Sequence, residues 1–142
     1  MVDNRPDYRD EATALFTRFA QKHELIHSVE DYDDFFNWEF PVQERLSLEL
    51  TLGFSFGDEL HFGVEQFWSY FFPFPERAAI FERALDAWVE GNARVVPVPL
   101  GGRALQLLEA GRWKTIYWAN CFWLVPRNPK WTITNQKDWQ QV

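Results

Sequence analysis

A run of strict alternation between residues 46 and 56 constrains the fold of this chain more than any other feature. Every second position holds a large apolar residue, and the positions between are polar or small; the apolar set is Leu46, Leu48, Leu50, Leu52, Phe54 and Phe56. A period of two is that of a β-strand with one buried and one polar face, typical of an antiparallel sheet. Gly57-Asp58 follows and predicts a tight turn, after which Leu60, Phe62 and Val64 resume the alternation on a returning strand. A shorter alternation precedes this hairpin, at Phe36, Trp38 and Phe40.

Two other segments have the period of a helix. Apolar residues at spacings of three and four predict a helix over residues 7–23, with Asp7, Asp10 and Glu11 in its first turns. The segment Glu76 to Glu90 predicts a second helix. It follows Pro73 and Pro75, and Gly91 supplies its stop.

The remaining strands are expected in the C-terminal part of the chain. Val95, Val96 and Val98 predict a short strand, placed at an edge because Pro97 and Pro99 cannot donate to a ladder. Residues 104–108 and 113–122 predict a hairpin that turns at residues 109–112. We therefore expect an α+β fold, a mostly antiparallel sheet with two helices packed on one face. The length of 142 residues indicates a single domain, with residues 126–142 as a loosely ordered tail.

Composition and charge narrow the classes of function. The net charge is −7, and it is unevenly distributed: −7 over residues 1–44, −4 over 45–102 and +4 over 103–142. An acidic chain repels phosphate backbones, so we expect no nucleic-acid partner. The sequence starts without an apolar leader segment and contains no apolar run of the ~20 residues that cross a bilayer, so a cytoplasmic protein without a membrane partner is expected. The single cysteine, Cys121, excludes an intramolecular disulfide.

One short motif points to metal chemistry. His23-Glu24-Leu25-Ile26-His27 matches HExxH, in which two imidazoles one helical turn apart hold Zn²⁺ and the glutamate polarises a bound water. Over these five residues the chain resembles zinc metallopeptidases of the zincin type. The resemblance implies a zinc-dependent hydrolase with His23 and His27 as ligands and Glu24 as the general base.

Two features of the sequence weigh against this hydrolase. A catalytic zinc usually has three protein ligands, and the remaining histidine is His61, with Glu76 as the best-placed acidic alternative. The motif also stands at the expected end of the first helix, before β-branched residues and an acidic stretch. If that helix ends at Lys22 or His23, the two histidines do not share a face and the motif is accidental. We therefore expect no cofactor, with zinc as the alternative.

The acidic stretch is itself a candidate binding site. Its four carboxylates are Glu30, Asp31, Asp33 and Asp34. It lacks the alternating acids, central glycine and terminal glutamate of an EF-hand loop. Two interpretations remain: a solvated connection between helix and strand, or a surface that docks a basic partner.

Aromatic residues are unusually frequent, with 14 Phe, 8 Trp and 4 Tyr. The segment 113–123 places aromatics on both faces of its expected strand, Trp113 and Tyr117 on one face and Ile116 and Trp118 on the other. A strand buried on both faces would account for this pattern. The alternative is an exposed aromatic surface, since Trp and Tyr anchor protein interfaces. Such a surface also suits a homodimer or the stacking of sugar rings.

The sequence thus favours a small acidic, non-enzymatic protein-binding domain, comparable in physical character to an inhibitor or chaperone. Its expected partner is another protein, of basic character, and its expected binding residues are Glu30, Asp31, Asp33, Asp34, Trp113 and Trp118. The zinc-dependent hydrolase and an aromatic-platform carbohydrate-binding module are the two alternatives.

Overall fold

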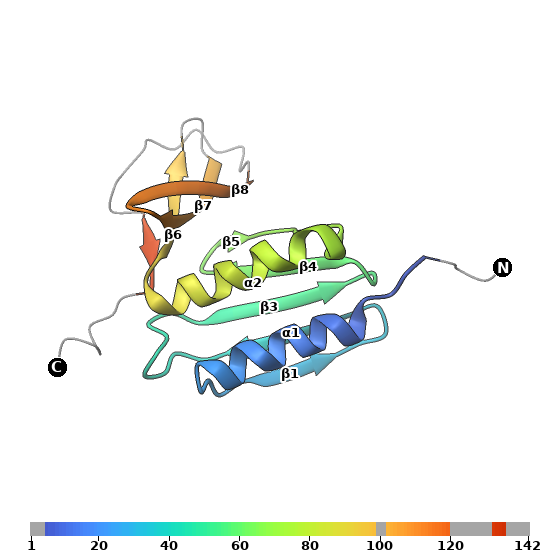
Figure 1. Cartoon of the computed structure of the whole chain (residues 1–142). Coiled ribbons are helices and arrows are strands. Elements are labelled where there is room, and N and C mark those ends of the chain that lie inside the picture. Colours follow the sequence, from blue (N-terminus) through green and yellow to red (C-terminus); the bar gives the residue numbers. More distant parts are fainter. Residues whose placement is uncertain (1–4, 99–101, 120–131, 136–142) are drawn as a thin grey trace.

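The computed structural model describes residues 5–98, 102–119 and 132–135 of the chain. Two helices and two antiparallel sheets form an α+β fold, as the sequence predicts (Figure 1). The elements in chain order are α1 (Arg9–Lys22), β1 (Ser28–Asp31), β2 (Phe35–Phe40), β3 (Leu50–Ser55), β4 (Glu59–Val64), β5 (Phe67–Trp68), α2 (Phe74–Glu90), β6 (Ala93–Val98), β7 (Gly102–Glu109), β8 (Arg112–Ala119) and β9 (Ile133–Thr134).

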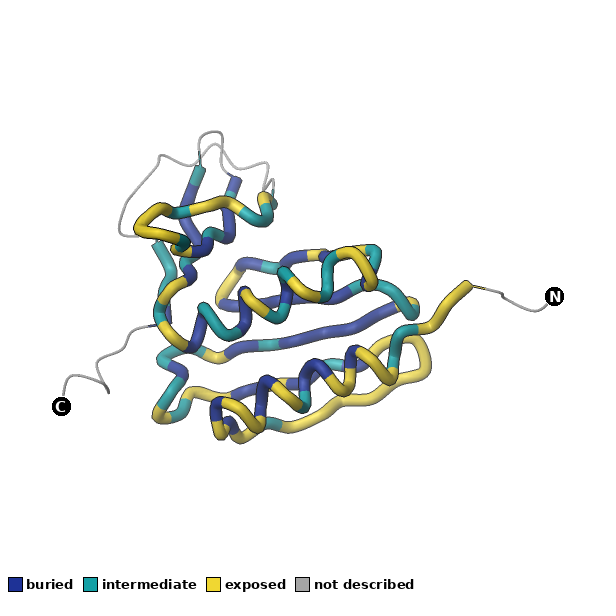
Figure 2. Tube along the Cα trace, viewed as in Figure 1, coloured by how far each residue is buried: buried dark blue, intermediate teal, exposed yellow. Residues whose placement is uncertain are grey.

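The larger sheet is a five-stranded meander in the order β1-β2-β3-β4-β5. Both helices lie along the same face of this sheet (Figure 1). The alternation predicted from the sequence directs one side chain in two toward the helices, and these side chains, including Phe36, Leu52, Phe54 and Phe62, are almost fully buried. The central strands are dark along their length in Figure 2, whereas β1 is exposed throughout. Neither of the two described helices covers the other face of the sheet.

The turn between β3 and β4 begins one residue earlier than the alternation suggests. The strand ends at Ser55, and Phe56 and Gly57 both have positive φ, 54° and 73°. This mirror-image turn suits the twist of two hairpin strands, and glycine takes the second position without strain. As a result Phe56 leaves the buried face, and 69% of it is exposed.

The two helices begin and end close to the predicted positions. Helix α1 spans Arg9–Lys22, with Asp10 and Glu11 in its first turn, where the helix dipole favours anions. Helix α2 starts earlier than expected, at Phe74, whose N–H donates to Oδ1 of Asp58 at 2.7 Å. It stops at Gly91, which has the left-handed φ of 79° that glycine adopts readily. No helix in the described part of the chain is long and apolar enough to cross a membrane.

The C-terminal strands form a separate sheet, in the order β8-β7-β6-β9. It lies beyond the end of α2 (Figure 1) and shares one apolar core with the larger sheet. Tyr117 of β8 joins the two sheets by packing on Phe67 and Phe71. The sequence predicts β6 as an edge strand, but its first half also pairs with β9, at Arg94 and Val95. Pro97 lies beyond that second ladder, as its missing N–H requires.

The faces expected for β8 are wrong, and a β-bulge is the reason. The register between β7 and β8 shifts at Leu105/Gln106, which leaves one extra residue in β8. Trp113 pairs with Leu108 and Trp118 with Ala104, and these two β7 residues share a face. The bulge therefore places Trp113 and Trp118 on the same outer face, while Tyr117 points toward the core.

Of the expected C-terminal tail, residues 132–135 are described, and they include β9 and the buried Asn135. The rest of the stretch 126–142, like Cys121 and the end of the predicted hairpin at residues 120–122, lies outside the described residues.

Candidate functional site

The HExxH segment does not form a helical turn. Helix α1 ends at Lys22, His23 caps it, and Glu24 has a φ of 53°, in the left-handed region. His23 and His27 therefore do not share a helical face, as the zinc interpretation requires. Because the helix ends at Lys22, the match to HExxH is accidental. The β-branched residues Ile26 and Val29 that follow disfavour a helix and favour the extended conformation that the chain takes at β1.

The two histidines instead make separate contacts. His23 is buried, and its Nε2 lies 2.7 Å from Oδ1 of Asp86 on α2, a hydrogen bond in which the imidazole donates. His27 stacks on Trp38, with ring centroids 4.2 Å apart and an interplanar angle of 6°. Across the described ranges, no group of three or more His, Cys, Asp or Glu side chains is placed to hold a metal ion.

The acidic stretch forms the outer edge of the larger sheet. Glu30 and Asp31 belong to β1, and Asp33 and Asp34 belong to the turn that leads into β2. All four residues are exposed, and β1 pairs only with β2 within the described chain. Asp31 forms an ion pair with Arg9 of α1 but remains largely in contact with solvent. The structure thus gathers the four predicted carboxylates in one place.

Exposed aromatic rings lie beside these carboxylates. Tyr32 and Phe35 stack on each other at a centroid distance of 4.6 Å, and they are 52% and 38% exposed. The N–H of Phe56 donates to the backbone oxygen of Asp34 at 2.9 Å, so the exposed residue Phe56 lies next to this acidic turn. Sequence reasoning missed Phe35 and Phe56 as surface residues. We call these three rings, together with the carboxylates of Asp31, Asp33 and Asp34, the acidic–aromatic edge.

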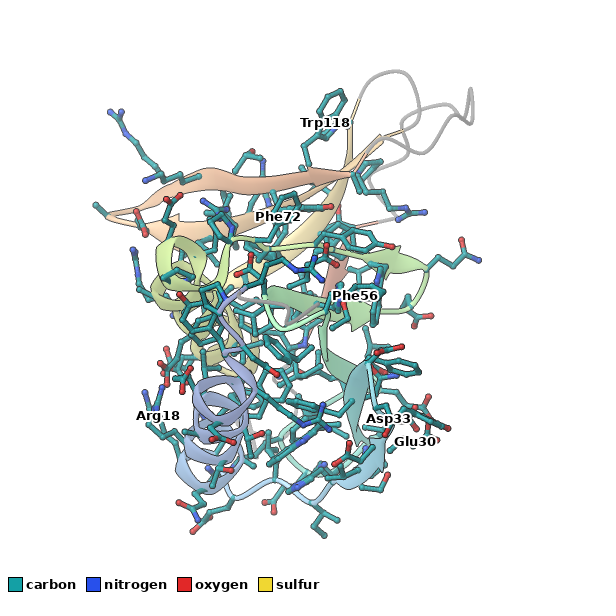
Figure 3. All side chains as sticks on the ribbon, turned by 90° about the vertical axis from the view of Figure 1, so that its right-hand side faces the viewer. Arg18, Glu30, Asp33, Phe56, Phe72 and Trp118 are labelled. Carbon is teal, nitrogen blue, oxygen red and sulfur yellow. The ribbon has the colours of Figure 1, made fainter. Side chains whose placement is uncertain are left out.

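A shallow groove continues from this edge toward the start of α2. Its volume is ≈ 320 Å³, and it is lined by Arg5, Pro6, Tyr8, Phe56, Asp58, Glu59, Phe72, Pro73 and Pro75. Phe56 and Phe72 stand exposed at this end of the molecule, which faces the viewer in Figure 3. The groove is therefore apolar over much of its wall, with carboxylates at Asp58 and Glu59.

The two predicted tryptophans belong to a different surface. Trp118 is 57% exposed, and its ring lies over Gly102, where an added Cβ would come within 2.5 Å of the indole nitrogen. Trp113 is half-buried and packs under the guanidinium of Arg94, 4.1 Å from the ring centroid. Figure 3 shows Trp118 far from Glu30 and Asp33. The structure thus separates the tryptophans from the acidic residues with which the sequence grouped them.

The face of the larger sheet that the helices leave open carries a polar cluster around His61. The imidazole is buried between Trp68, stacked at 5.1 Å, and Tyr70, edge-on at 4.9 Å. Its Nε2 lies 2.6 Å from Oγ of Ser55, and its Nδ1 lies 3.0 Å from the backbone oxygen of Ser69. Burial lowers the pKa of His61 below its ordinary value of 6.5, although the Ser69 carbonyl and the Glu59 carboxylate both oppose this effect.

The sequence contained a signal for this cluster. Leu52 and Phe54 on one strand and Leu60 and Phe62 on the next all belong to the buried face, so Ser55 and His61, at the positions between, share the other face on neighbouring strands. The register, with Ser55 opposite Glu59 and Gly53 opposite His61, makes them diagonal neighbours.

Comparison with known proteins finds no matching family model, no matching curated protein and no matching solved structure.

Proposed function

We propose that this protein is a protein-binding domain that captures a basic, arginine-bearing partner at the acidic–aromatic edge. The observation that carries the proposal is the interleaving of exposed carboxylates and exposed rings on one short segment, Asp31 to Phe35, with Phe56 beside it. Aromatic rings and carboxylates together match the guanidinium group, which pairs with carboxylates and stacks on rings.

The position of the segment supports an extended partner. Among the described strands β1 pairs with β2 alone, and a partner strand that adds to the other edge of β1 would gain main-chain hydrogen bonds there. The surrounding charge supports a basic partner, because the first 44 residues carry a net charge of −7. Such a field steers a cationic partner toward the edge and weakens as salt increases.

A defined peptide tests the proposal. We would measure the fluorescence anisotropy of a labelled ten-residue peptide of alternating Arg and Val, with a peptide of alternating Glu and Val as the negative probe. The triple variant Asp31→Asn, Asp33→Asn and Asp34→Asn should bind the arginine peptide about tenfold more weakly, because each exposed pair contributes about 0.2–1 kcal/mol. Replacing Arg by Lys in the peptide should also weaken binding, since lysine does not stack on rings as arginine does.

A matched control separates local contacts from total charge. The triple variant Glu44→Gln, Glu49→Gln and Glu65→Gln also removes three negative charges, but from exposed residues outside the acidic–aromatic edge. Glu49 precedes β3 and Glu65 follows β4, so both lie at the opposite end of these strands from Phe56. This control should retain most of the affinity. Equal weakening in both triple variants, or no measurable binding of the arginine peptide by the natural chain, would contradict the proposal.

A further inference from the structure

The hydrogen bonds of His61 fix which ring nitrogen carries the proton. A neutral imidazole has one donor and one acceptor nitrogen. The backbone oxygen of Ser69 can only accept, so Nδ1, at 3.0 Å from it, is the donor. The lone pair of Nε2 therefore points at Oγ of Ser55, and the Ser55 hydroxyl donates to it across 2.6 Å. This is the arrangement of a nucleophile beside a general base whose tautomer is held by a third group.

The neighbouring residues keep the pair in this state. The rings of Trp68 and Tyr70 enclose the imidazole and favour its neutral form. Within the described residues, Glu59 is the titratable side chain that makes a polar contact with the pair, its Oε2 being 3.2 Å from Oγ of Ser55 and 3.9 Å from Nε2 of His61. While the imidazole is neutral, the Ser55 hydroxyl keeps its single proton on Oγ and donates it toward Nε2, the nearer of the two acceptors.

The groove lies beside the pair, because Glu59, whose Oε2 is 3.2 Å from Oγ of Ser55, also contributes to the lining of the ≈ 320 Å³ groove. Ser55 and His61 do not themselves line the groove, and Ser55 is 8% exposed. The groove walls at Phe56, Phe72 and Tyr8 suit a small apolar or aromatic group. Asn37 lies diagonally across from Ser55 on the same face, and its side chain rests over Gly53. Its amide is the side-chain donor available to a developing oxyanion.

From this geometry we infer that Ser55 is an activated nucleophile, with His61 as its general base, that reacts with activated carboxylic esters carrying small apolar groups. In the first step Oγ bonds to the ester carbonyl carbon, its proton moves to Nε2 of His61, and the carbon–oxygen bond to the leaving group breaks as that proton passes to the departing oxygen. In the second step water attacks the acyl-serine, Nε2 takes its proton, and the acid leaves as the proton returns to Oγ. The sum is hydrolysis of one ester by one water.

Labelling by a fluorophosphonate tests the nucleophile directly. In that reaction Oγ bonds to phosphorus, fluoride departs, and the hydroxyl proton is taken by His61. We would incubate the full chain with the probe at pH 7.5 and locate the adduct by tandem mass spectrometry, with p-nitrophenyl acetate hydrolysis as the second readout. The inference predicts one adduct per chain, on Ser55, which is absent from Ser55→Ala and from the urea-unfolded chain. Ser28→Ala, at an exposed serine whose hydroxyl has no imidazole partner among the described residues, is the matched control and should label normally.

Two variants distinguish activation from simple exposure. His61→Asn places an amide donor near the position of Nδ1, so it can keep the bond to Ser69, but it has no base beside Ser55; labelling should fall at least a hundredfold, within the range of general-base contributions. Asn37→Ala should slow ester hydrolysis about a hundredfold without preventing the adduct. The inference is overturned if the natural chain gives no Ser55 adduct, or if a folded His61→Asn variant labels as fast as the natural chain.

A pH profile covers the case in which His61→Asn does not fold. Labelling of the natural chain should decrease as the pH falls, with its midpoint below pH 6.5, because burial lowers the pKa of His61. A labelling rate that does not respond to pH down to 5 would mean that no imidazole base is involved.

Discussion

The side-chain amide of Asn135 donates from Nδ2 to the backbone oxygen of Val89 at 3.1 Å, which joins the described C-terminal segment to the end of α2. The same nitrogen donates to the Arg45 oxygen at 2.9 Å, and Oδ1 accepts the N–H of Ser47 at 2.7 Å. A buried side chain thus connects three segments that are far apart in the sequence, with donors and acceptor both used. Asn135 lies within the stretch 126–142, and its hydrogen bonds attach that part of the chain to the core.

We expect Asn135→Ala to lower the free energy of unfolding by about 1–3 kcal/mol, because it leaves two backbone oxygens and one N–H without their partner. Urea unfolding measures the change. Asn135→Asp is the informative companion, since it keeps the acceptor oxygen and removes both donors; it should also destabilise. A loss below 0.5 kcal/mol in both variants would show that the segment 132–135 contributes little to the core.

The contact between His23 and Asp86 gives a second prediction. Asp86→Ala removes the acceptor of a buried imidazole together with the exposed ion pair to Lys22, and it should cost about 1–3 kcal/mol in urea unfolding. Glu82→Ala, one turn earlier on α2, removes an exposed ion pair with Arg18 and should cost no more than about 1 kcal/mol. Equal effects of the two substitutions would contradict the distinction between the buried and the exposed contact.

The separation of the two histidines of HELIH gives a third prediction. Because His23 bonds to Asp86 and His27 stacks on Trp38, we expect tag-free protein supplemented with zinc and then desalted to hold well below one zinc per chain. Elemental analysis measures this, with His27→Ala as the comparison. About one zinc per chain, lost in the variant, would restore the hydrolase interpretation of the motif and require the segment 23–27 to rearrange.

The secondary structure was largely predictable, because each signal is local. The period-two runs, the turn glycines at 57 and 111, and Pro73 and Pro75 at the start of α2 each act on the residues around them. The predicted hairpins and helices formed at these places. Two sheets in place of one were not predictable, since alternation states which face of a strand is apolar but not which strands pair. The bulge in β8 likewise depends on how the hairpin packs, and it moved Trp118 to the face of Trp113.

The candidate site was predictable only in part. The four carboxylates are adjacent in the sequence, so their proximity needed no fold. Phe56 carries the parity of a buried residue, and only the turn that begins there exposes it. Ser55 and His61 are separated by five residues, and their hydrogen bond depends on an exact hairpin register that composition does not encode.

The close approach of Trp68 to Gly63 gives a fourth prediction. A Cβ on Gly63 would lie 2.4 Å from Cε3 of the indole, so Gly63→Ala forces Trp68 to move. We expect a loss of about 1–3 kcal/mol in unfolding free energy, together with a changed tryptophan emission spectrum. In a Trp68→Ala background the same substitution should cost much less, because the colliding ring is gone. An undiminished cost in the double variant would place the strain elsewhere.

The burial of His61 makes stability depend on pH. Its pKa is lowered in the folded chain from the ordinary value of 6.5, mainly by desolvation, so the unfolded chain binds the proton more readily. The free energy of unfolding should therefore be independent of this group above pH 6.5 and should decrease as the pH falls below it. The slope from one group is at most about 1.4 kcal/mol per pH unit. Urea unfolding of the natural chain and of His61→Asn at pH 7.5, 6.5 and 5.5 isolates the contribution, since His23 and His27 are present in both. If the two chains lose stability in parallel between pH 6.5 and 5.5, the folded protein accepts the proton on His61 as readily as the unfolded chain does.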